Sequence, residues 1–240
     1  MTMHRFGQTR GARRCDHLLQ TPDTFVRAPL PGMKGATAIV HAAPAIGAKF
    51  TQYTAEFEAG GTLGSTEAQR FVYVLEGQLE IDGDLLESGG YVWLPPAAPA
   101  LIRAALGSRA AVIEKPYVPL AGIPCPTMFR GTETALTPTP LFSDPDVQVR
   151  SLIPSDPAFD LAVNTMTFQP GASLPMVEIH VMEHGLSMLQ GNGIYRLGDH
   201  WYPVEAGDFI WMAPYLPQWF GALGKKPARY LIYKDWNRLP

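Results

Sequence analysis

Cysteine, charge and long apolar runs are all scarce in this sequence. Only Cys15 and Cys125 occur among its 240 residues, so a framework of disulfide bonds is not expected. No apolar run approaches the roughly 20 residues that span a bilayer, and no apolar segment follows the basic start MTMHRFGQTRGARR as it would in a secretion signal. We therefore expect two reduced thiols, no contact with a membrane and a cytoplasmic location.

Charge is also mixed in sign. Charged residues make up 17% of the chain and the formal net charge is -3, and no basic stripe of the kind that neutralises phosphates is present. Nucleic acid is therefore not an expected partner. Hydrophobic residues, in contrast, reach 46%, with 23 Gly and 23 Pro. This composition favours short strands joined by tight turns over long amphipathic helices, and it predicts an all-β protein.

One sequence plan occurs twice along the chain. It is seen in VYVLEGQLEIDGDLLESGGYVWLPP (72–96) and again in SMLQGNGIYRLGDHWYPVEAGDFIWMAP (187–214). Each copy runs through an apolar strand, a Gly turn, an alternating strand, a second Gly turn and an apolar strand that ends at Pro. Turns in general require Gly, so unrelated β-meanders look partly alike. The ordered match of Trp93 with Trp211, followed by Pro in both copies, favours a true repeat.

A further match defines the extent of the two copies. AVIEK (111–115) corresponds to YLIYK (230–234), which pairs the terminal lysines of these segments. A Pro- and Thr-rich stretch between the copies interrupts any strand pattern. We therefore predict an arm over residues 1–20, an N-terminal barrel over 21–130 and a C-terminal barrel over 131–240.

Glu178, His180 and His184 lie in the second copy at positions of equal parity. On a β-strand, whose side chains alternate, they would point to one face. The β-branched residues between them would point to the other face, namely Val177, Ile179 and Val181. Carboxylate and imidazole groups that converge in a dry cavity are costly to leave unpaired, and a divalent cation resolves this. We therefore predict that the three residues bind a metal ion.

Gln218 is the expected fourth ligand. It follows the Gly207-Asp208 corner within APYLPQWF, and its amide oxygen suits a hard cation. Two nitrogen and two oxygen donors leave about two positions of an octahedron open for water or substrate, which favours manganese or iron over a closed structural zinc site. We predict one Mn(II) per chain.

The first copy lacks a comparable set of donors. The positions that correspond to the four predicted ligands are occupied by Gly64, Thr66, Arg70 and Ala100. Because the scaffold is repeated while the four polar groups are not, these groups are hard to explain as requirements of the fold. The N-terminal barrel is therefore predicted to be metal-free, with a structural or subunit-contact role.

A competing motif overlaps the predicted ligands. HVMEH (180–184) also reads H-x-x-E-H, the inverted zinc-protease signature, which requires a helix. Pro175, the nearby β-branched residues and Gly185 oppose a long helix here. Glu183 is out of phase with the ligands, and we expect it to be a surface carboxylate or a partner for the second nitrogen of His184.

At these residues the sequence resembles the cupins, and more closely the bicupin (S)-ureidoglycine aminohydrolases. The first cupin motif is present in altered form from Gly171 to Gly191, and the second is represented by Pro203, Gly207 and Pro214. Gln218 replaces the usual His, and a set of Glu, His, His and Gln marks the aminohydrolases among cupins. The resemblance implies two tandem cupin barrels of the double-stranded β-helix, or jelly-roll, type.

The resemblance also implies an activity and its site residues. The expected reaction is the Mn(II)-dependent hydrolysis of (S)-ureidoglycine to (S)-ureidoglycolate and ammonia in allantoin and purine breakdown, by a homo-oligomer. The family's substrate contacts carry over onto Glu178, Tyr195, Tyr230 and Lys234, and the catalytic residues are expected to be Lys234 and Glu178. Taken alone, Lys234 could equally be a solvated lysine at a strand end, and each tyrosine a half-buried barrel residue.

Two other functions remain open on the sequence. One is a different bicupin metalloenzyme of the decarboxylase or dioxygenase type acting on small acids, for which three His ligands would be expected in place of Gln218. The other is a non-catalytic cupin that binds a small molecule, which would not need Lys234 and Tyr195 beside four ligands. Release of ammonia from ureidoglycine separates these possibilities.

Overall fold

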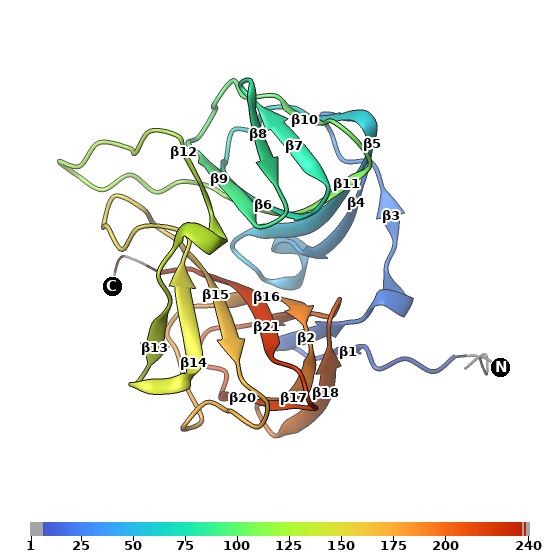
Figure 1. Cartoon of the computed structure of the whole chain (residues 1–240), viewed down its shortest axis with the longest axis vertical. Helices are drawn as coiled ribbons and strands as arrows, with labels where there is room; N and C mark the ends of the chain where they lie inside the picture. The colour runs from blue at the N-terminus through green and yellow to red at the C-terminus, as the bar shows by residue number, and fades with distance from the viewer. Residues whose placement is uncertain (1–6, 237, 239–240) are drawn as a thin grey trace. The chain divides into compact units, whose positions relative to one another are not determined.

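The computed structural model describes residues 7–236 and 238, and it consists mainly of β-strands (Figure 1). Within this described part there is no α-helix. Three single-turn 3-10 helices occur, η1 (Pro22–Thr24), η2 (Pro44–Ile46) and η3 (Glu133–Ala135). None of the described helices is long and apolar enough to cross a membrane. The all-β prediction is confirmed.

The chain forms two compact units, and each is assembled from separate stretches of sequence. The unit that we name the C-terminal barrel contains the described residues up to Phe25, Pro138–Val149 and Asn164–Lys234. The unit that we name the N-terminal barrel contains Val26–Thr137, Arg150–Val163 and the described residues from Asp235 onward. The two units therefore interleave along the chain.

Two sheets form the C-terminal barrel. The larger has eight strands in the order β1-β2-β19-β16-β21-β15-β14-β13, and the smaller has the order β18-β17-β20. Their bounds are β1 Ala12–Arg13, β2 His17–Gln20, β13 Thr139–Leu141, β14 Asp144–Ser151, β15 Ala162–Phe168, β16 His184–Gln190, β17 Asn192–Leu197, β18 His200–Glu205, β19 Phe209–Met212, β20 Gln218–Leu223 and β21 Ala228–Lys234. The core between them includes Phe168, Leu186, Tyr195 and Phe220.

The first strands of the chain belong to this C-terminal barrel. In Figure 1, β1 and β2 (blue) lie among the orange strands, and β2 pairs with β19. Arg10 donates hydrogen bonds to both carboxylate oxygens of Asp208, at 2.7 and 2.9 Å, and His17 Nε2 lies 2.9 Å from the hydroxyl of Tyr202. The N-terminal segment thus covers an edge of the sheet that holds β16.

The N-terminal barrel is built on a ten-stranded sheet. Its main order is β12-β9-β6-β11-β5-β10-β7-β8, with β4 paired to both β3 and β5. The bounds are β3 Arg27–Ala28, β4 Met33–Ala42, β5 Thr51–Leu63, β6 Gln69–Glu76, β7 Gln78–Ile81, β8 Asp84–Glu87, β9 Gly90–Leu94, β10 Ile102–Ala104, β11 Ser108–Lys115 and β12 Phe129–Thr132. Its core is almost entirely aliphatic and aromatic, with Tyr53, Val72 and Val112 at its centre.

Equivalent glycines make the same tight turn in both barrels. Gly77 has a φ of 78° and Gly191 a φ of 73°, values that side chains rarely adopt. A Cβ at Gly77 would lie 2.4 Å from Ser108 Oγ, and a Cβ at Gly191 would lie 2.5 Å from the carbonyl oxygen of Pro227. Both the dihedral and the close approach require Gly, which explains why the two sequence copies match at this position.

Candidate active site

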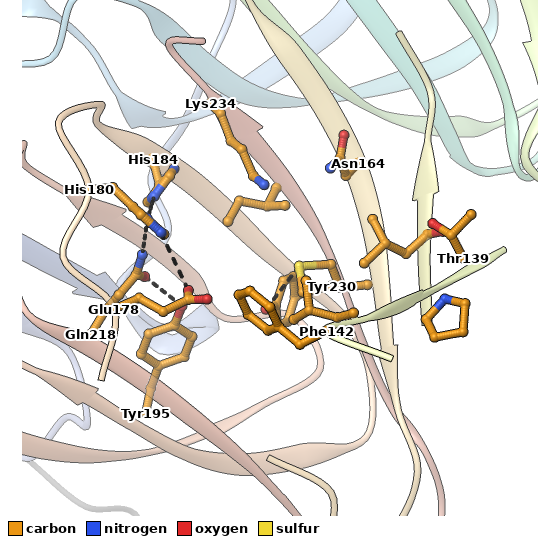
Figure 2. Close-up of a pocket in the computed structure, with 15 residues that line it drawn as sticks. Thr139, Phe142, Asn164, Glu178, His180, His184, Tyr195, Gln218, Tyr230 and Lys234 are labelled. Atoms are coloured by element: carbon orange, nitrogen blue, oxygen red, sulfur yellow. Dashed lines mark hydrogen bonds and ion pairs between the residues drawn. The ribbon is translucent and has the colours of Figure 1, made fainter. Parts of the chain in front are cut away.

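A cavity of about 380 Å³ lies inside the C-terminal barrel. Figure 2 shows the side chains that line it. All of the residues singled out from the sequence face this cavity, namely Glu178, His180, His184, Tyr195, Gln218, Tyr230 and Lys234. They come from strands β16, β17, β20 and β21 and from the segment that precedes β16.

Glu178 and His180 do not lie on a regular strand, contrary to expectation. Only His184 begins a strand, β16, and residues 175–183 form bends and irregular backbone. Glu178 is held by an isolated bridge to Gln218, in which the two backbones exchange hydrogen bonds of 2.8 and 2.9 Å. Pro175 cannot donate to a ladder, which is consistent with the irregular start of this segment.

The residues between the predicted ligands point outward, as expected. Val177, Ile179 and Val181 are 39%, 61% and 38% exposed, while Glu178 and His180 line the cavity. The alternation of inward and outward side chains therefore holds without a continuous strand. Because no helix forms over HVMEH, the inverted zinc-protease geometry is also ruled out.

Three of the predicted ligands and Tyr195 form one hydrogen-bonded cluster, and the fourth predicted ligand, Glu178, lies beside it. His180 Nδ1 lies 2.8 Å from His184 Nε2 and 2.9 Å from Gln218 Nε2. Gln218 Oε1 accepts a hydrogen bond of 2.9 Å from the hydroxyl of Tyr195. Glu178 Oε2 lies 3.7 Å from His180 Nε2. Together these residues bring two imidazole rings, an amide and a carboxylate to one end of the cavity, as the dashed lines in Figure 2 show.

Burial controls the protonation of the two histidines. The pKa of His184 is lowered well below its usual range by desolvation, and the charge of Lys234 acts in the same direction. Desolvation and then Lys234 also lower the pKa of His180. Both rings are therefore held neutral at neutral pH, which is the form that binds metal ions.

Glu178 and Lys234 also respond to the dry surroundings. Burial raises the pKa of the Glu178 carboxyl, and the charge of Lys234 partly opposes the rise. Burial lowers the pKa of the Lys234 ammonium, and Glu178 partly opposes that shift. Within the described residues, no hydrogen bond or ion pair joins Lys234 Nζ to another group. An ammonium placed in this way is suited to bind an anionic ligand or to exchange a proton.

The donor set fits a divalent metal ion. Its members are two neutral imidazoles, one carboxylate and one amide oxygen, the ligand types suited to manganese or iron. In the described part of the chain, no group of three His, Cys, Asp or Glu side chains has the geometry of a formed metal site, and His180 instead bonds to both His184 and Gln218. The His180 Nδ1 has a single in-plane lone pair but two nitrogen neighbours, so the cluster does not satisfy all of its own members.

The phenol groups of the two site tyrosines already donate hydrogen bonds. Tyr195 donates to Gln218 Oε1, and Tyr230 donates to Met166 Sδ at 3.3 Å. Both rings are buried in the barrel core, and burial raises the pKa of both phenols. They are therefore neutral groups whose oxygen atoms can still accept a hydrogen bond from a ligand.

Glu183 is buried and not on the surface. It is 2% exposed and accepts a hydrogen bond of 3.0 Å from Trp211 Nε1. Trp211 lies on β19, which pairs with β16 beside the site. Neither expectation for this carboxylate holds, because it is not on the surface and, among the residues that the structure describes, no hydrogen bond joins it to the second nitrogen of His184, Nδ1.

Asn164 is a cavity residue that the sequence reasoning missed. It lies on β15 and lines the cavity together with Thr139 and Phe142 of the β13–β14 hairpin. Figure 2 shows these three residues on the side of Lys234 opposite to the histidines. The sequence pattern that could have identified Asn164 is the alternation of side chains in NTMTF (164–168), which puts Asn164 on the same face of the strand as Met166.

At the corresponding place in the N-terminal barrel, Arg70, Glu114 and Tyr53 form a closed network. They stand on β6, β11 and β5, which are neighbours in the same order as β16, β21 and β15. Tyr53 donates a hydrogen bond of 2.9 Å to Glu114 Oε1, and Arg70 Nε donates one of 2.8 Å to the same oxygen. The charges of Arg70 and Glu114 cancel within the network.

Glu114, and not Lys115, is the counterpart of Lys234. Glu114 follows the inward-facing Val112 by two positions, as Lys234 follows the inward-facing Ile232. Lys115 points the other way, into an ion pair. The sequence match that paired the two lysines is therefore wrong by one residue, and in a strand one residue reverses the face.

Comparison with known proteins gives these features a family. Residues 164–233 match the Cupin domain family. The chain is 37% identical to the (S)-ureidoglycine aminohydrolase of Arabidopsis thaliana, over 98% of this chain and 80% of that protein. It is 32% identical to the (S)-ureidoglycine aminohydrolase of Escherichia coli strain K12, over 92% of this chain and 88% of that protein.

Solved structures agree with the fold. A Pseudomonas aeruginosa protein described as glyoxylate-induced has a TM-score of 0.88 at 31% identity and covers 97% of this chain and 93% of its own. Bacillus subtilis oxalate decarboxylase has a TM-score of 0.72 at 11% identity, over 97% of this chain and 81% of its own, which shows a likeness of fold alone. The predicted cupin architecture is confirmed. The chain belongs to the (S)-ureidoglycine aminohydrolase family of cupin proteins.

Proposed function

We propose that this protein is a hydrolase that converts (S)-ureidoglycine and water to (S)-ureidoglycolate and ammonia. The observation that carries the proposal is the convergence of Glu178, two histidines and Gln218 beside Lys234 in one cavity. The names of the relatives from Arabidopsis thaliana and Escherichia coli support the same activity. A decarboxylase or dioxygenase with the common three-His set is disfavoured because Gln218 stands where the third His is expected.

We further propose Mn(II) as the cofactor, one per chain, with Glu178, His180, His184 and Gln218 as its ligands. The oxalate decarboxylase of Bacillus subtilis, which has the same fold, has Mn(II) centres, and this makes manganese a reasonable ion for the site. When bound, such an ion supplies Lewis-acid activation of water and withdraws charge from the reacting carbon. The neutral imidazoles described above are ready to bind it without losing a proton.

The stereochemistry of the reaction places two demands on the site. The C–N bond to the substrate amine breaks, and a C–O bond to water forms at the same carbon. In the priority order that assigns (R) and (S), the new hydroxyl ranks above the ureido nitrogen, whereas the lost amine ranks below it. Replacement with retention would therefore turn an (S) substrate into an (R) product. An (S) product from an (S) substrate requires inversion at this carbon. Water must therefore enter on the face opposite to the departing amine, and the two faces need separate proton-handling groups.

Glu178 and Lys234 can serve these two faces. Glu178 Oε accepts a proton from the entering water as the general base. Lys234 Nζ gives a proton to the departing amine, which leaves as ammonia, and the lowered pKa of the ammonium favours this donation. Water supplies one proton and the hydroxyl group, so atoms and charge balance over the cycle once Glu178 returns its proton to Lys234.

Tyr195 and Gln218 orient the site. Tyr195 holds the Gln218 amide through a hydrogen bond to Oε1, which fixes the direction of the amide. The phenol oxygens of Tyr195 and Tyr230 accept hydrogen bonds from N–H groups of the substrate. Apolar residues such as Leu141, Val149 and Ile232 line the remaining wall and exclude bulk water from the reacting carbon.

A coupled assay tests the proposal. Ureidoglycine is unstable, so it is generated in place from allantoate, and ammonia and the enantiomer of ureidoglycolate are followed with Mn(II) supplied. We expect ammonia release beyond the spontaneous rate and a single (S) product, and we expect a chelator to abolish both. Spontaneous rates and racemic ureidoglycolate with Mn(II) present would refute the proposed activity.

A further inference from the structure

Asn164 interrupts an otherwise apolar inner row of β15. Met166 and Phe168, at the next positions of the same parity, are buried in the core of the C-terminal barrel. Asn164 stands between Ala162 and Met166 in this row and lines the cavity. The fold alone would favour an apolar residue here, because the rest of the row packs against aromatic rings.

The Asn164 amide lacks a partner among the residues that the structure describes. No hydrogen bond or ion pair joins its oxygen or nitrogen to another described group. In the N-terminal barrel the corresponding strand is β5, and its inward-facing Tyr53 donates a hydrogen bond to Glu114. The Asn164 side chain is half-buried, so water in the cavity can occupy its donor and acceptor until a ligand replaces that water.

The sheet places Asn164 at a useful distance from the metal ligands. His184 and Lys234 are direct partners on β16 and β21, and β15 is the next strand along. Two strand spacings separate β16 from β15, about 10 Å in all. A small substrate that reacts beside His184 and extends past Lys234 therefore ends near Asn164, as the arrangement in Figure 2 illustrates.

We propose that Asn164 is a specificity-determining residue that binds the ureido group of the substrate. This inference rests on the proposed function and adds the residue that recognises the part of the substrate remote from the reacting carbon. The Asn164 Nδ2 donates to the ureido carbonyl oxygen, and the Asn164 Oδ1 accepts from the terminal ureido N–H.

Complementarity of the two groups is the chemical reason. A side-chain amide presents a donor and an acceptor side by side, and a ureido group presents the matching acceptor and donor in one plane. Lys234 has donors only, and the two site tyrosines have already committed their hydroxyl hydrogens. Among the described cavity residues outside the metal cluster, Asn164 thus has both a hydrogen-bond donor and an acceptor available. A ligand without the terminal N–H gives Oδ1 no hydrogen bond.

Two stable ligands separate this role from others. N-carbamoylglycine has the ureido group and the carboxylate but no amine to lose, and N-acetylglycine replaces the terminal NH₂ with a methyl group. Their affinities are measured by calorimetry on the Mn(II)-supplied protein and on Asn164→Leu, which keeps the volume and removes the amide. We expect the unaltered protein to prefer N-carbamoylglycine by about tenfold, as one hydrogen bond to a buried acceptor allows.

The Asn164→Leu variant should lose this preference and bind the two ligands within about twofold of each other, with unchanged metal content. Asn164→Ala repeats the test without added bulk in case the leucine variant does not fold. Thr167→Val, on the outer row of the same strand, is the matched control and should keep the tenfold preference.

Two results would overturn the inference. One is a preference that persists in both Asn164 variants, and the other is no preference in the unaltered protein. Either can occur while ammonia is still released from ureidoglycine, in which case the proposed activity holds and the assignment of Asn164 alone fails. If ammonia release itself is absent, the proposed function fails whatever the ligands show.

Discussion

The two barrels place different side chains on the same three neighbouring strands. In the N-terminal barrel, Arg70 and Tyr53 both bond to Glu114, and the network is complete. The C-terminal barrel has His184, Lys234 and Asn164 on the corresponding strands, and the described residues supply no partner for the last two. One barrel therefore uses this position for stability, and the other leaves polar groups that a ligand can satisfy.

The two barrels differ in whether these polar side chains have hydrogen-bond or ion-pair partners, and not in whether polar side chains are present. Side chains without partners are the ones that indicate a ligand site. Both trios are polar and partly charged, and both lie inside a cupin barrel. Only the trio of the C-terminal barrel lies beside the hydrogen-bonded pair of His180 and Gln218 and beside Glu178.

The largest effect is expected when His180 and His184 are both replaced by Ala. The double variant should lose its bound metal and its ammonia release to background, because two of the four proposed ligands are removed. Metal analysis should find at most about one transition-metal ion per chain in the unaltered protein, and none in the variant. Two tightly bound ions per chain would show that the N-terminal barrel also binds metal.

Lys234→Ala should lower turnover by at least about a hundredfold, the lower range for a positioned charge or proton donor. Folding and metal content should remain, since no ion pair to Lys234 exists within the described residues. The melting temperature is even expected to hold or rise, because the variant no longer buries an uncompensated ammonium. Unchanged kinetics would return Lys234 to the role of a solvated lysine.

Gln218→His should retain metal and lose most of the activity, by about a hundredfold. Imidazole is a good donor for transition metals, so affinity should hold. The change alters the position of the open sites, and it removes the amide oxygen that accepts from Tyr195. Metal analysis and the coupled assay are run on one preparation. If both metal and activity stay complete, Gln218 is not a ligand.

Glu114→Ala is the mirror experiment in the N-terminal barrel. It leaves Arg70, which is 3% exposed, without its carboxylate, and it should lower the free energy of unfolding by about 2–4 kcal/mol. Turnover per folded molecule should be unchanged. Denaturant unfolding and the coupled assay measure the two quantities separately. A catalytic loss without a loss of stability would contradict the structural role of this network.

The last effect appears only in acid, and near neutral pH it is the smallest. Burial lowers the pKa of His41 in the N-terminal barrel from 6.5 to about 3. Between these pH values His41 is protonated in the unfolded chain and neutral in the folded chain. The contribution of His41 to the free energy of unfolding therefore falls as the pH drops from about 6.5 toward 3, by up to about 1.4 kcal/mol per pH unit.

His41→Gln removes this proton uptake. The free energy of unfolding is measured in urea between pH 6 and 4, and its slope against pH gives the number of protons taken up on unfolding. This number should be lower by about one in the variant than in the unaltered protein. Val26→Gln, at an exposed position without a titratable side chain, is the control and should leave the slope unchanged. Identical slopes in all three proteins would mean that His41 is protonated in the folded state.

Much of the site could be predicted because its chemistry is local in the sequence. Glu178, His180 and His184 are neighbours along the chain, and the repeat shows that the fold does not require them. The repeated turns at Gly77 and Gly191 also follow from backbone geometry that only Gly adopts easily. The sequence therefore predicted the all-β class and the second copy as the place to look.

What the sequence could not supply depends on contacts between distant segments. The pairing of β2 with β19 joins residues about two hundred positions apart, and no local pattern announces it. The segment around Glu178 was expected to be a strand because its side chains alternate, yet its backbone pairs only at the bridge to Gln218. Asn164 was missed because a single polar residue on a strand has no meaning until the cavity beside it is known.

Anomalous diffraction at the manganese edge, from crystals grown with Mn(II), tests the central comparison most directly. The account predicts one peak per chain, in the C-terminal barrel, within bonding distance of Glu178, His180, His184 and Gln218. No peak should occur at the Arg70, Glu114 and Tyr53 network. A peak in the N-terminal barrel, or a manganese ion bound away from those four residues, would contradict the assignment of function to one barrel and stability to the other.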